Sequence, residues 1–330
     1  MGPTHEDTVK SVALDVGFSL SGIADVSPHA RSNEVFDNWL GAGMHAGMSW
    51  LVRHGEKRGD ISTLLDGARS AVCVGLNYYQ EEEKQQRDAD GSDGRGVFSV
   101  YVHGRNYHDV MDEMLARLES RLKELYPEMH SVACADIRPV SDRALAIRAG
   151  IGWLGKNSSV ISPRFGSWIF LGELVTDLEL SPDRPLATLC GNCTRCIDSC
   201  PTGALDEPFV VDARKCISYL TIEERGEIPD GLGGRLGVNV YGCDRCQSVC
   251  PFNKVATSST AFDRSDRSAL IDMPLDELET ISDGEFLEKT EGSAIRRCRA
   301  EGMRRNASVV RRNIEAKDRA DFRSAGRRKT

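Results

Sequence analysis

Apolar residues near the N-terminus recur first with the period of a helix and then with that of a strand. Residues 8–20 carry a helical apolar stripe that ends near Gly17, and residues 22–26 form a short apolar run. Residues 39–53 have the pattern of a loop and a helix. Residues 71–79 are rich in valine and end in an aromatic pair, which predicts a buried strand. We therefore expect a domain in which helices and strands alternate.

The segment 107–125 has the clearest helical period in the chain, and its stripe predicts burial in a core. The stripe consists of Val110, Met111, Met114, Leu115, Leu118 and Leu122. Residues 98–102, 131–135 and 166–176 are strand candidates, the last because Trp168, Phe170 and Leu174 alternate along it. The first 180 residues are thus expected to form an α+β domain.

Two further regions differ from this pattern. Residues 80–96 are almost wholly polar and contain glycine turn signals, which predicts an exposed, mobile loop. After residue 258 the pattern becomes helical, with four expected core positions: Leu275, Leu278, Ile281 and Phe286.

Seven of the 11 cysteines fall in two related segments, and an eighth lies between them. Residues 190–201 have the spacing C-x2-C-x2-C-x3-C-P of bacterial ferredoxins, in which three thiolates bind one iron–sulfur cluster and the fourth binds a neighbouring cluster. Residues 243–251 repeat the ending C-x2-C-x3-C-P, and Cys216 lies upstream as a further thiol. The crossed rule predicts two 4Fe-4S clusters, the first bound by Cys190, Cys193, Cys196 and Cys250 and the second by Cys200, Cys216, Cys243 and Cys246.

Two other roles of these cysteines, a zinc site and a disulfide framework, fit the sequence pattern less well. A zinc ribbon needs only four of the eight thiols and leaves both Cys-Pro endings unexplained. A disulfide framework is typical of short exported domains, and this chain is long and shows no secretory signal. Cys73 and Cys134 are expected to be buried small hydrophobes, and Cys298 has no partner at ligand spacing.

The charge of the chain is unevenly distributed. The formal net charge is −8, but residues 296–330 contain 13 Lys/Arg against 4 Asp/Glu, which is +9 and leaves −17 for the remainder. A basic tail on an acidic body is typical of proteins with a polyanionic partner, and a disordered solubilising tail would have the same composition.

The N-terminus is acidic and lacks both an apolar signal core and twin arginines, and no segment is long and apolar enough to span a membrane. We expect a cytoplasmic protein. The stretch Gly150–Gly155 matches G-x-G-x-x-G, but a helix-forming segment precedes it where a dinucleotide fold has a strand. These glycines are therefore expected to form tight turns or to let the backbone approach a ligand.

These patterns divide the chain into three predicted domains. Residues 1–180 form the α+β domain, residues 181–257 a ferredoxin-like domain with two clusters, and residues 258–330 a helical region with the basic tail. A simple electron carrier would not need the large first domain, which predicts an enzyme that passes single electrons to a further cofactor.

Several blocks, in this order, resemble the epoxyqueuosine reductase (QueG) family of cobalamin-dependent iron–sulfur enzymes. They lie at residues 17–24, 76–78, 101–108, 136–140, 149–157, 166–174 and 216–223 and in both cysteine segments. The octapeptide Cys-Ile-Ser-Tyr-Leu-Thr-Ile-Glu at 216–223 is the most specific of them.

The resemblance implies a nitroreductase-like cobalamin-binding domain, a ferredoxin-like module with two 4Fe-4S clusters and a short helical C-terminal region. The implied reaction reduces the epoxide of epoxyqueuosine at the wobble position of tRNA to queuosine and water. It further implies an external low-potential electron donor and a monomer without membrane attachment.

The resemblance also implies roles for individual residues. Asp136 is the expected proton donor, although a helix N-cap would have the same composition. The expected cobalamin contacts are Arg58, Tyr101, Asp136, Lys156, Asn157, Ser158, Leu171, Ser218, Tyr219 and Arg225. On composition alone, these are core, surface or turn residues. His103 and His108 are expected to be structural and not cobalt ligands.

The sequence departs from the family at three places. His103 and Asn106 replace an expected arginine and aspartate, Asp142 replaces a glutamate, and a C-terminal helical repeat found in many members is missing. Two other functions share parts of the pattern. A reductive dehalogenase also combines cobalamin with two clusters but normally carries a twin-arginine signal, and a ferredoxin-like carrier would bind clusters without cobalamin.

Overall fold

The computed structural model describes residues 2–53, 55–80, 91, 93–136, 138–262 and 266–327, with the side chains of 56, 57 and 320–327 excluded. Most of the predicted mobile loop at 80–96 lies outside the described residues. Within the described parts of the chain, every helix is too short or too polar to cross a lipid bilayer.

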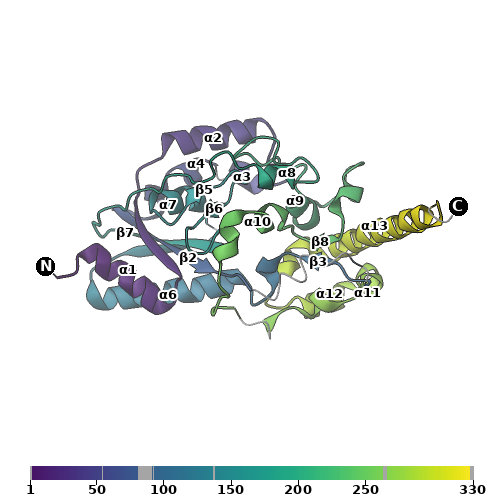
Figure 1. Ribbon diagram of the computed structural model, residues 1–330. Coiled ribbons are helices and arrows are strands. Elements are labelled where there is room, and N and C mark those ends of the chain that lie inside the picture. Colours follow the sequence, from purple (N-terminus) through teal and green to yellow (C-terminus); the bar gives the residue numbers. More distant parts are fainter. Residues whose placement is uncertain are drawn as a thin grey trace.

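A four-stranded antiparallel sheet forms the centre of the N-terminal region (Figure 1). Its order is β1 (Leu20–Asp25), β2 (Ser70–Asn77), β7 (Ile169–Thr176) and β4 (Ser131–Cys134). Each strand overlaps a segment predicted from its apolar pattern. The register pairs Cys73 with Glu173 across β2 and β7, and Cys134 with the same Glu173 across β4 and β7.

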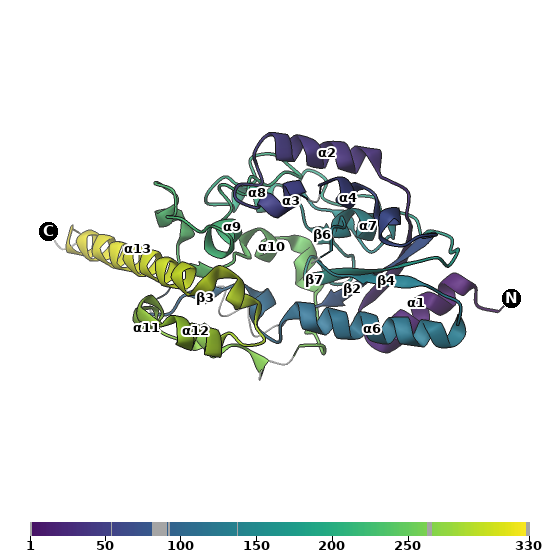
Figure 2. The ribbon, with the colours of Figure 1, turned by 180° about the vertical axis from the view of Figure 1, so that it is seen from behind.

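Helices cover both faces of this sheet, as Figures 1 and 2 show from opposite sides. Helices α1 (His5–Val16) and α6 (Tyr107–Leu125) pack on one face, where the predicted stripe of α6 is buried together with Leu174. Helix α7 (Asp142–Arg148) packs on the other face, against Val175 and its neighbours. Successive residues of a strand point to opposite faces, so β7 contributes to two separate cores.

Short helices connect and border the sheet. They are α2 (Ala30–Gly41), α3 (Ser49–Arg53) and α4 (Gly55–Gly59). The predicted loop and helix at 39–53 correspond to the end of α2, the turns at 42–48 and α3. Strands β5 (Trp153–Leu154) and β6 (Val160–Ile161) form a hairpin after α7. Gly150 has a φ of 69°, which favours glycine, and a Cβ at Gly152 would lie 2.5 Å from the carbonyl oxygen of Ile161. The G-x-G-x-x-G stretch therefore follows a helix and forms tight turns, as predicted.

The predicted strand at 98–102 is wrong for its second half. Strand β3 (Val97–Phe98) ends early and a 3-10 turn covers Val100–Val102. The carboxylate of Asp244 causes this turn, because it accepts hydrogen bonds from the Ser99 hydroxyl at 2.6 Å and from the Val100 backbone N–H at 2.8 Å.

The cysteine-rich region contains three short helices, α8 (Arg195–Asp198), α9 (Ile217–Ile222) and α10 (Arg245–Ser248). Its strand β8 (Asn239–Tyr241) pairs in parallel with β3 from the N-terminal region. Five short 3-10 helices complete the described regular structure, at Ile61–Leu64, Gly233–Leu236, Pro251–Val255, Ala269–Asp272 and Ala294–Cys298.

Helices α11 (Leu275–Thr280), α12 (Asp283–Lys289) and α13 (Arg299–Arg327) form the C-terminal region. All four predicted core positions here are buried, and they share a core with Phe98 and Tyr241. Disorder is the wrong interpretation for the first part of the basic tail, because α13 begins at Arg299 and buries Met303 and Val310. The far end of α13 projects from the body in both views (Figures 1 and 2).

Candidate functional site

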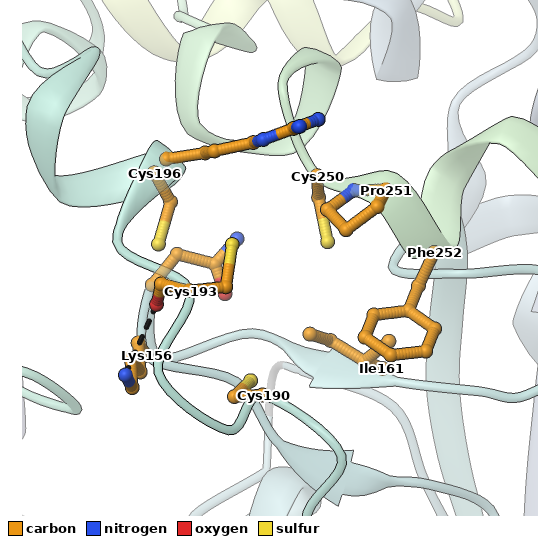
Figure 3. A pocket seen from close by; sticks show the side chains of 10 residues that line it. Lys156, Ile161, Cys190, Cys193, Cys196, Cys250, Pro251 and Phe252 are labelled. Carbon is orange, nitrogen blue, oxygen red and sulfur yellow. Dashed lines mark hydrogen bonds between the residues drawn. The ribbon is translucent and has the colours of Figure 1, made fainter.

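The first predicted group of four cysteines surrounds one cavity. Cys190, Cys193, Cys196 and Cys250 line it, and Figure 3 shows their side chains around a common space. Ile161 and Phe252 form an apolar part of its wall, and the Phe252 ring meets the Trp153 ring edge to face at 4.9 Å. The Lys156 ammonium group stabilises the loop around this cavity. It donates hydrogen bonds to the carbonyl oxygens of Gly191 at 2.7 Å and Cys193 at 3.0 Å.

The chemistry of this donor set fits an iron–sulfur cluster. Burial raises the pKa of Cys196, backbone N–H groups lower it, and the charges of Cys250 and Cys190 raise it. Burial likewise raises the pKa of Cys250. Four thiolates that repel one another need compensating positive charge, which the iron of a cluster supplies. Among the described residues, no three His, Cys, Asp or Glu side chains converge as ligands of a single ion.

The second predicted group also interacts as a unit. Cys216 occupies the N-cap position of α9. Burial raises its pKa, and the charge of Cys200 adds a smaller effect in the same direction. Burial and the charges of Cys243 and Cys216 raise the pKa of Cys246. Cys246 also interacts with Cys196 of the first group, so the two groups are neighbours. The cluster ligand roles of all eight thiols remain a prediction.

Asp136 follows strand β4 in a turn, and its φ of 54° lies in the left-handed region that non-glycine residues rarely adopt. Its carboxylate accepts a hydrogen bond from the Tyr107 hydroxyl at 2.5 Å and lies 3.6 Å from His108 Nε2. The side chain is 62% exposed. Asp136 is not an N-cap, since α7 begins six residues later and is capped by Ser141. The structure therefore leaves this carboxylate open to a ligand.

Aromatic rings connect Asp136 to the second cysteine group. Tyr107 stacks on Phe170 with ring centroids 4.5 Å apart, and Phe170 contacts Tyr78 at 4.4 Å. The Tyr78 hydroxyl accepts a hydrogen bond from Gln247, the residue after Cys246, at 3.1 Å. Burial raises the pKa of Tyr107, and the charge of Asp136 adds to this effect, so Tyr107 keeps its proton and donates it.

Two predicted cobalamin contacts have buried polar atoms without a hydrogen-bond partner. They are Nε of Arg58 and Oγ of Ser158, in the described part of the chain. Arg58 donates from its Nη1 to the Val140 carbonyl oxygen at 2.8 Å, four residues after Asp136. Ser158 has a φ of 63°. Unpaired buried polar atoms are costly, so these two fit a site completed by a cofactor with polar side groups.

Lys156 and Asn157 lie at the first cysteine cavity, where both contribute to its lining. Asn157 is buried and its Nδ2 lies 3.5 Å from the Cys246 carbonyl oxygen. Leu171 is partly buried on the α7 face of the sheet. Tyr101 lies nearer to Asp136, because its ring meets Tyr107 edge to face at 6.0 Å. The predicted cobalamin contacts therefore lie in two places, one at the first cysteine cavity and one nearer to Asp136.

The remaining predicted contacts lie in or just after α9. Tyr219 accepts a hydrogen bond from the Gly47 N–H at 2.9 Å, and Ser218 is its neighbour in the helix. Arg225 donates to the carbonyl oxygens of Ile222 at 3.1 Å and Cys298 at 3.3 Å.

A bidentate ion pair joins Arg297 to Glu223, the residue that follows α9. The hydrogen bond to Glu223 raises the pKa of Arg297, and the charges of Tyr241 and Asp136 raise it further. The end of α9 thus faces the Asp136 side of the site.

The sequence patterns missed one residue near the site. Glu173 lies in the middle of β7 and is 0% exposed, and no role was predicted for it. An acidic residue within an otherwise apolar strand was the available signal. Burial raises its pKa well above the usual range, and the neighbouring Asp142 raises it further.

Comparison with known proteins agrees with this arrangement. Residues 189–253 match the 4Fe-4S double cluster binding domain, and residues 58–137 match the family described as Epoxyqueuosine reductase QueG, DUF1730. The epoxyqueuosine reductase of Gloeobacter violaceus is 41% identical over 313 residues, covering 93% of this chain and 95% of the relative. That of Salmonella typhimurium is 38% identical, covering 92% of this chain and 78% of the relative.

Solved structures are also similar. An epoxyqueuosine reductase crystallised with an epoxyqueuosine-modified tRNA-Tyr stem loop superposes with a TM-score of 0.82 at 31% identity, covering 93% of this chain and 80% of the other. The Bacillus subtilis enzyme, crystallised with its catalytic aspartate loop swung out of the active site, gives a TM-score of 0.82 at 31% identity, covering 93% and 81%. These similarities extend over nearly the whole length, and the chain belongs to the epoxyqueuosine reductase family.

Proposed function

We propose that this chain reduces the epoxide of epoxyqueuosine, in the anticodon of tRNA, to queuosine and water. The observation that carries the proposal is the line of contacts from Asp136 through Tyr107, Phe170 and Tyr78 to the residue beside Cys246. It brings an acidic group that can face a substrate close to a group of thiols that can hold a redox cluster.

In this proposal, two 4Fe-4S clusters receive single electrons from an external low-potential donor. Cys190, Cys193, Cys196 and Cys250 hold the first cluster, and Cys200, Cys216, Cys243 and Cys246 hold the second. The fit of the first set is supported by the cavity that its four side chains surround.

A nitroreductase-like domain built on the four-stranded sheet would hold cobalamin. The polar atoms of Arg58 and Ser158 that have no partner support this assignment, and both would donate to cofactor side groups. Tyr101, Leu171, Ser218, Tyr219 and Arg225 are the further proposed contacts, while Lys156 and Asn157 are placed closer to the first cysteine cavity. When bound, cobalamin supplies the low-potential redox chemistry that no amino-acid side chain can perform.

The protein's own contribution is to orient the substrate and to supply protons. Asp136 would donate a proton to the oxygen released from the epoxide, and the Tyr107 hydrogen bond would hold its carboxyl group in position. In one structure of the Bacillus subtilis relative, a catalytic loop that is named after an aspartate is swung out of the active site. The left-handed backbone of Asp136 supports a similar loop here. We further propose a monomer that acts in the cytoplasm, where tRNA is modified.

An anaerobic assay tests this function. The reconstituted chain, loaded with iron, sulfide and cobalamin, is incubated with a chemical one-electron reductant and a tRNA stem loop that carries epoxyqueuosine. We expect conversion to queuosine in the loaded protein and none in protein loaded with clusters alone. A chain that binds both clusters but no cobalamin would instead be an electron carrier, and the proposal would be wrong.

A further inference from the structure

Lys156 brings a positive charge to the first cysteine group. Its ammonium group donates hydrogen bonds to the carbonyl oxygens of Gly191 at 2.7 Å and Cys193 at 3.0 Å, and its side chain also lines the cavity (Figure 3). Both partners are neutral, and no carboxylate forms an ion pair with Lys156 in the described part of the chain. The charge can therefore act on a cluster that the four thiols hold.

The backbone around Lys156 is held in place by hydrogen bonds. Lys156 lies in the tight turn between β5 and β6, in which the Ser158 N–H donates to the Gly155 carbonyl oxygen at 2.9 Å. The carbonyl oxygen of Lys156 itself accepts a hydrogen bond from the Phe209 N–H at 2.9 Å. The turn thus fixes the ammonium group beside the first cysteine segment.

The two cysteine segments are related in structure as well as in sequence. Residues 193–196 read Cys-Thr-Arg-Cys, and residues 243–246 read Cys-Asp-Arg-Cys. Thr194 and Asp244 occupy equivalent positions, the N-caps of α8 and α10, and neither side chain caps its helix. The two segments therefore differ at this position by one carboxylate.

Asp244 is buried beside the second cysteine group, with 7% exposure. Its carboxylate accepts hydrogen bonds from the Ser99 hydroxyl at 2.6 Å and from the Val100 N–H at 2.8 Å. Burial raises the pKa of Cys243 to about 12, and the charge of Asp244 adds to this effect. The same charge raises the pKa of Cys246, on which burial has the larger effect. Asp244 thus acts as a negative charge on two thiols of the second group.

The other charged side chains of the two repeated segments are exposed. They are Arg195 and Asp198 in the first segment and Arg245 in the second. Near Cys200 and Cys216, the cations are Arg235, which is exposed, and Arg214 and Lys215, which form ion pairs with carboxylates. Water and salt screen exposed charges more than buried ones. The half-buried Lys156 and the buried Asp244 are therefore the charges that most distinguish the two groups.

A cluster becomes more negative when it takes up an electron. A nearby cation stabilises the reduced form and a nearby anion destabilises it, so the reduction potential depends on the surrounding charges. Lys156 and Asp244 therefore shift the two potentials in opposite directions. The second group also lies on the side of the proposed reaction, because Gln247 donates a hydrogen bond to the Tyr78 hydroxyl at 3.1 Å.

We infer that Lys156 raises the reduction potential of the first cluster and that Asp244 lowers that of the second, so that each electron reaches the first cluster before it passes to the second. The inference rests on the cluster assignment in the function proposed above. Each transfer oxidises the external donor by one electron. Removal of the epoxide oxygen as water consumes two electrons and two protons, so two such transfers complete one turnover.

A redox titration of the reconstituted full chain, followed by electron paramagnetic resonance, tests the potentials without an assay of activity. Wild-type protein should show two separate midpoint potentials, and Cys250→Ser should keep only the lower one. In Lys156→Gln the higher midpoint should fall while the lower stays, and in Asp244→Asn the lower midpoint should rise. We expect about a 10-fold change in the ratio of reduced to oxidised cluster, which is about 59 mV for one electron.

Matched variants separate the effect of charge from that of structure. Lys156→Arg keeps the cation and should keep the higher midpoint. Lys123 and Glu119 form an ion pair at 2.8 Å on α6, so Lys123→Gln and Glu119→Gln remove the same kinds of charge elsewhere and should leave both midpoints unchanged. Iron and sulfide are measured in every variant. If Asp244→Asn loses a cluster, the response of Lys156→Gln decides alone.

The outcomes separate this inference from the proposed function. Coincident midpoints in the wild type, or midpoints that stay unchanged or move equally in Lys156→Gln, would overturn the inference. A chain with such midpoints that still reduces epoxyqueuosine would refute the inference alone. A chain with the expected midpoints that reduces no epoxyqueuosine would refute the proposed function and leave the assignment of the two potentials standing.

Discussion

The Tyr107 hydroxyl lies 2.5 Å from a carboxylate oxygen of Asp136. Tyr107 is the first residue of α6, and its ring is fixed by stacking on Phe170 at an interplanar angle of 9°. Asp136 belongs to a different element, the turn after β4. A rigid aromatic side chain thus holds the exposed carboxylate of Asp136, whose backbone has an unfavourable conformation.

Replacing Tyr107 by Phe should lower turnover while cofactor loading is unchanged. The variant keeps the ring and its stacking but removes the donor to Asp136, and a hydrogen bond to a charged group contributes about 1.5–3 kcal/mol. We expect a rate about 10-fold to 100-fold lower in the anaerobic assay, with normal iron and cobalamin content. Tyr126→Phe is a suitable control, because that hydroxyl contacts His5 at the far end of α6. An unchanged rate in Tyr107→Phe would show that this hydrogen bond is not used.

Replacing Cys250 by Ser should remove one cluster and spare the other. Wild-type protein is expected to hold about eight irons and eight acid-labile sulfides after anaerobic reconstitution. Cys250 lines the first cavity and belongs to the second sequence segment, so its loss tests the crossed assignment directly. Chemical analysis should give about four irons, and electron paramagnetic resonance should show one remaining cluster.

The control for this experiment is Cys298→Ser. Cys298 is buried in the C-terminal core, away from both cysteine groups, and its replacement should leave iron content unchanged. Zinc without sulfide in the wild-type protein would contradict both cluster assignments.

Deleting residues 318–330 should weaken tRNA binding and make it less sensitive to salt. A deletion from residue 300 would remove Met303 and Val310 from the core, so the cut must follow Ile314, which packs on that core. The deleted segment carries five Lys/Arg and two Asp/Glu. Each lost phosphate contact should lower the slope of log affinity against log salt by about 0.7–0.9. An identical slope for a stably folded deletion variant would show that this end of α13 does not contact tRNA.

Glu173→Gln should change how stability depends on pH. The pKa of Glu173 is raised in the folded state, so folding takes up a proton where the unfolded chain has lost it, and stability falls as pH rises above the unfolded value of about 4.3. Glutamine removes this contribution. The melting temperature of the variant should therefore fall less between pH 5 and pH 8 than that of the wild type, by about 2 °C or more.

Glu119→Gln is the comparison, because the hydrogen bond from Lys123 lowers the pKa of Glu119 and keeps it ionised in the folded protein. Its melting temperature should follow the wild-type pH dependence. Parallel curves for wild type and Glu173→Gln would mean that Glu173 is already ionised in the folded protein.

Elements with a strong period were predictable from sequence. The helix at Tyr107–Leu125 and the strand at Ser131–Cys134 occur where the apolar pattern placed them, and the opening helix ends at Gly17, whose φ is 114°. The local pattern is sufficient in these cases for one of two reasons. Either the element buries a single apolar stripe, or it ends at a glycine, which can adopt a left-handed backbone conformation.

The helix in the basic tail and the burial of Glu173 could not be predicted from a local pattern, and the two reasons are opposite. In α13, small and apolar residues at 300, 303, 307 and 310 face the core between arginines that dominate the composition. In β7, a polar residue is buried because helices cover both faces of the sheet, which a single strand cannot indicate. Likewise, the contact between Tyr107 and Asp136 depends on two distant segments meeting in the fold.

The parallel pairing of β3 with β8 has a consequence for how the protein is made. Val97 and Phe98 pair with Asn239 and Tyr241, and helices synthesised last complete the same core. A ribosome-bound chain therefore cannot finish its N-terminal half until the cysteine segments and α13 have emerged. A nascent chain would expose Phe98 and the cysteine thiols at the same time. Iron limitation during growth should therefore reduce the yield of the whole protein, and not only that of the cysteine-rich region.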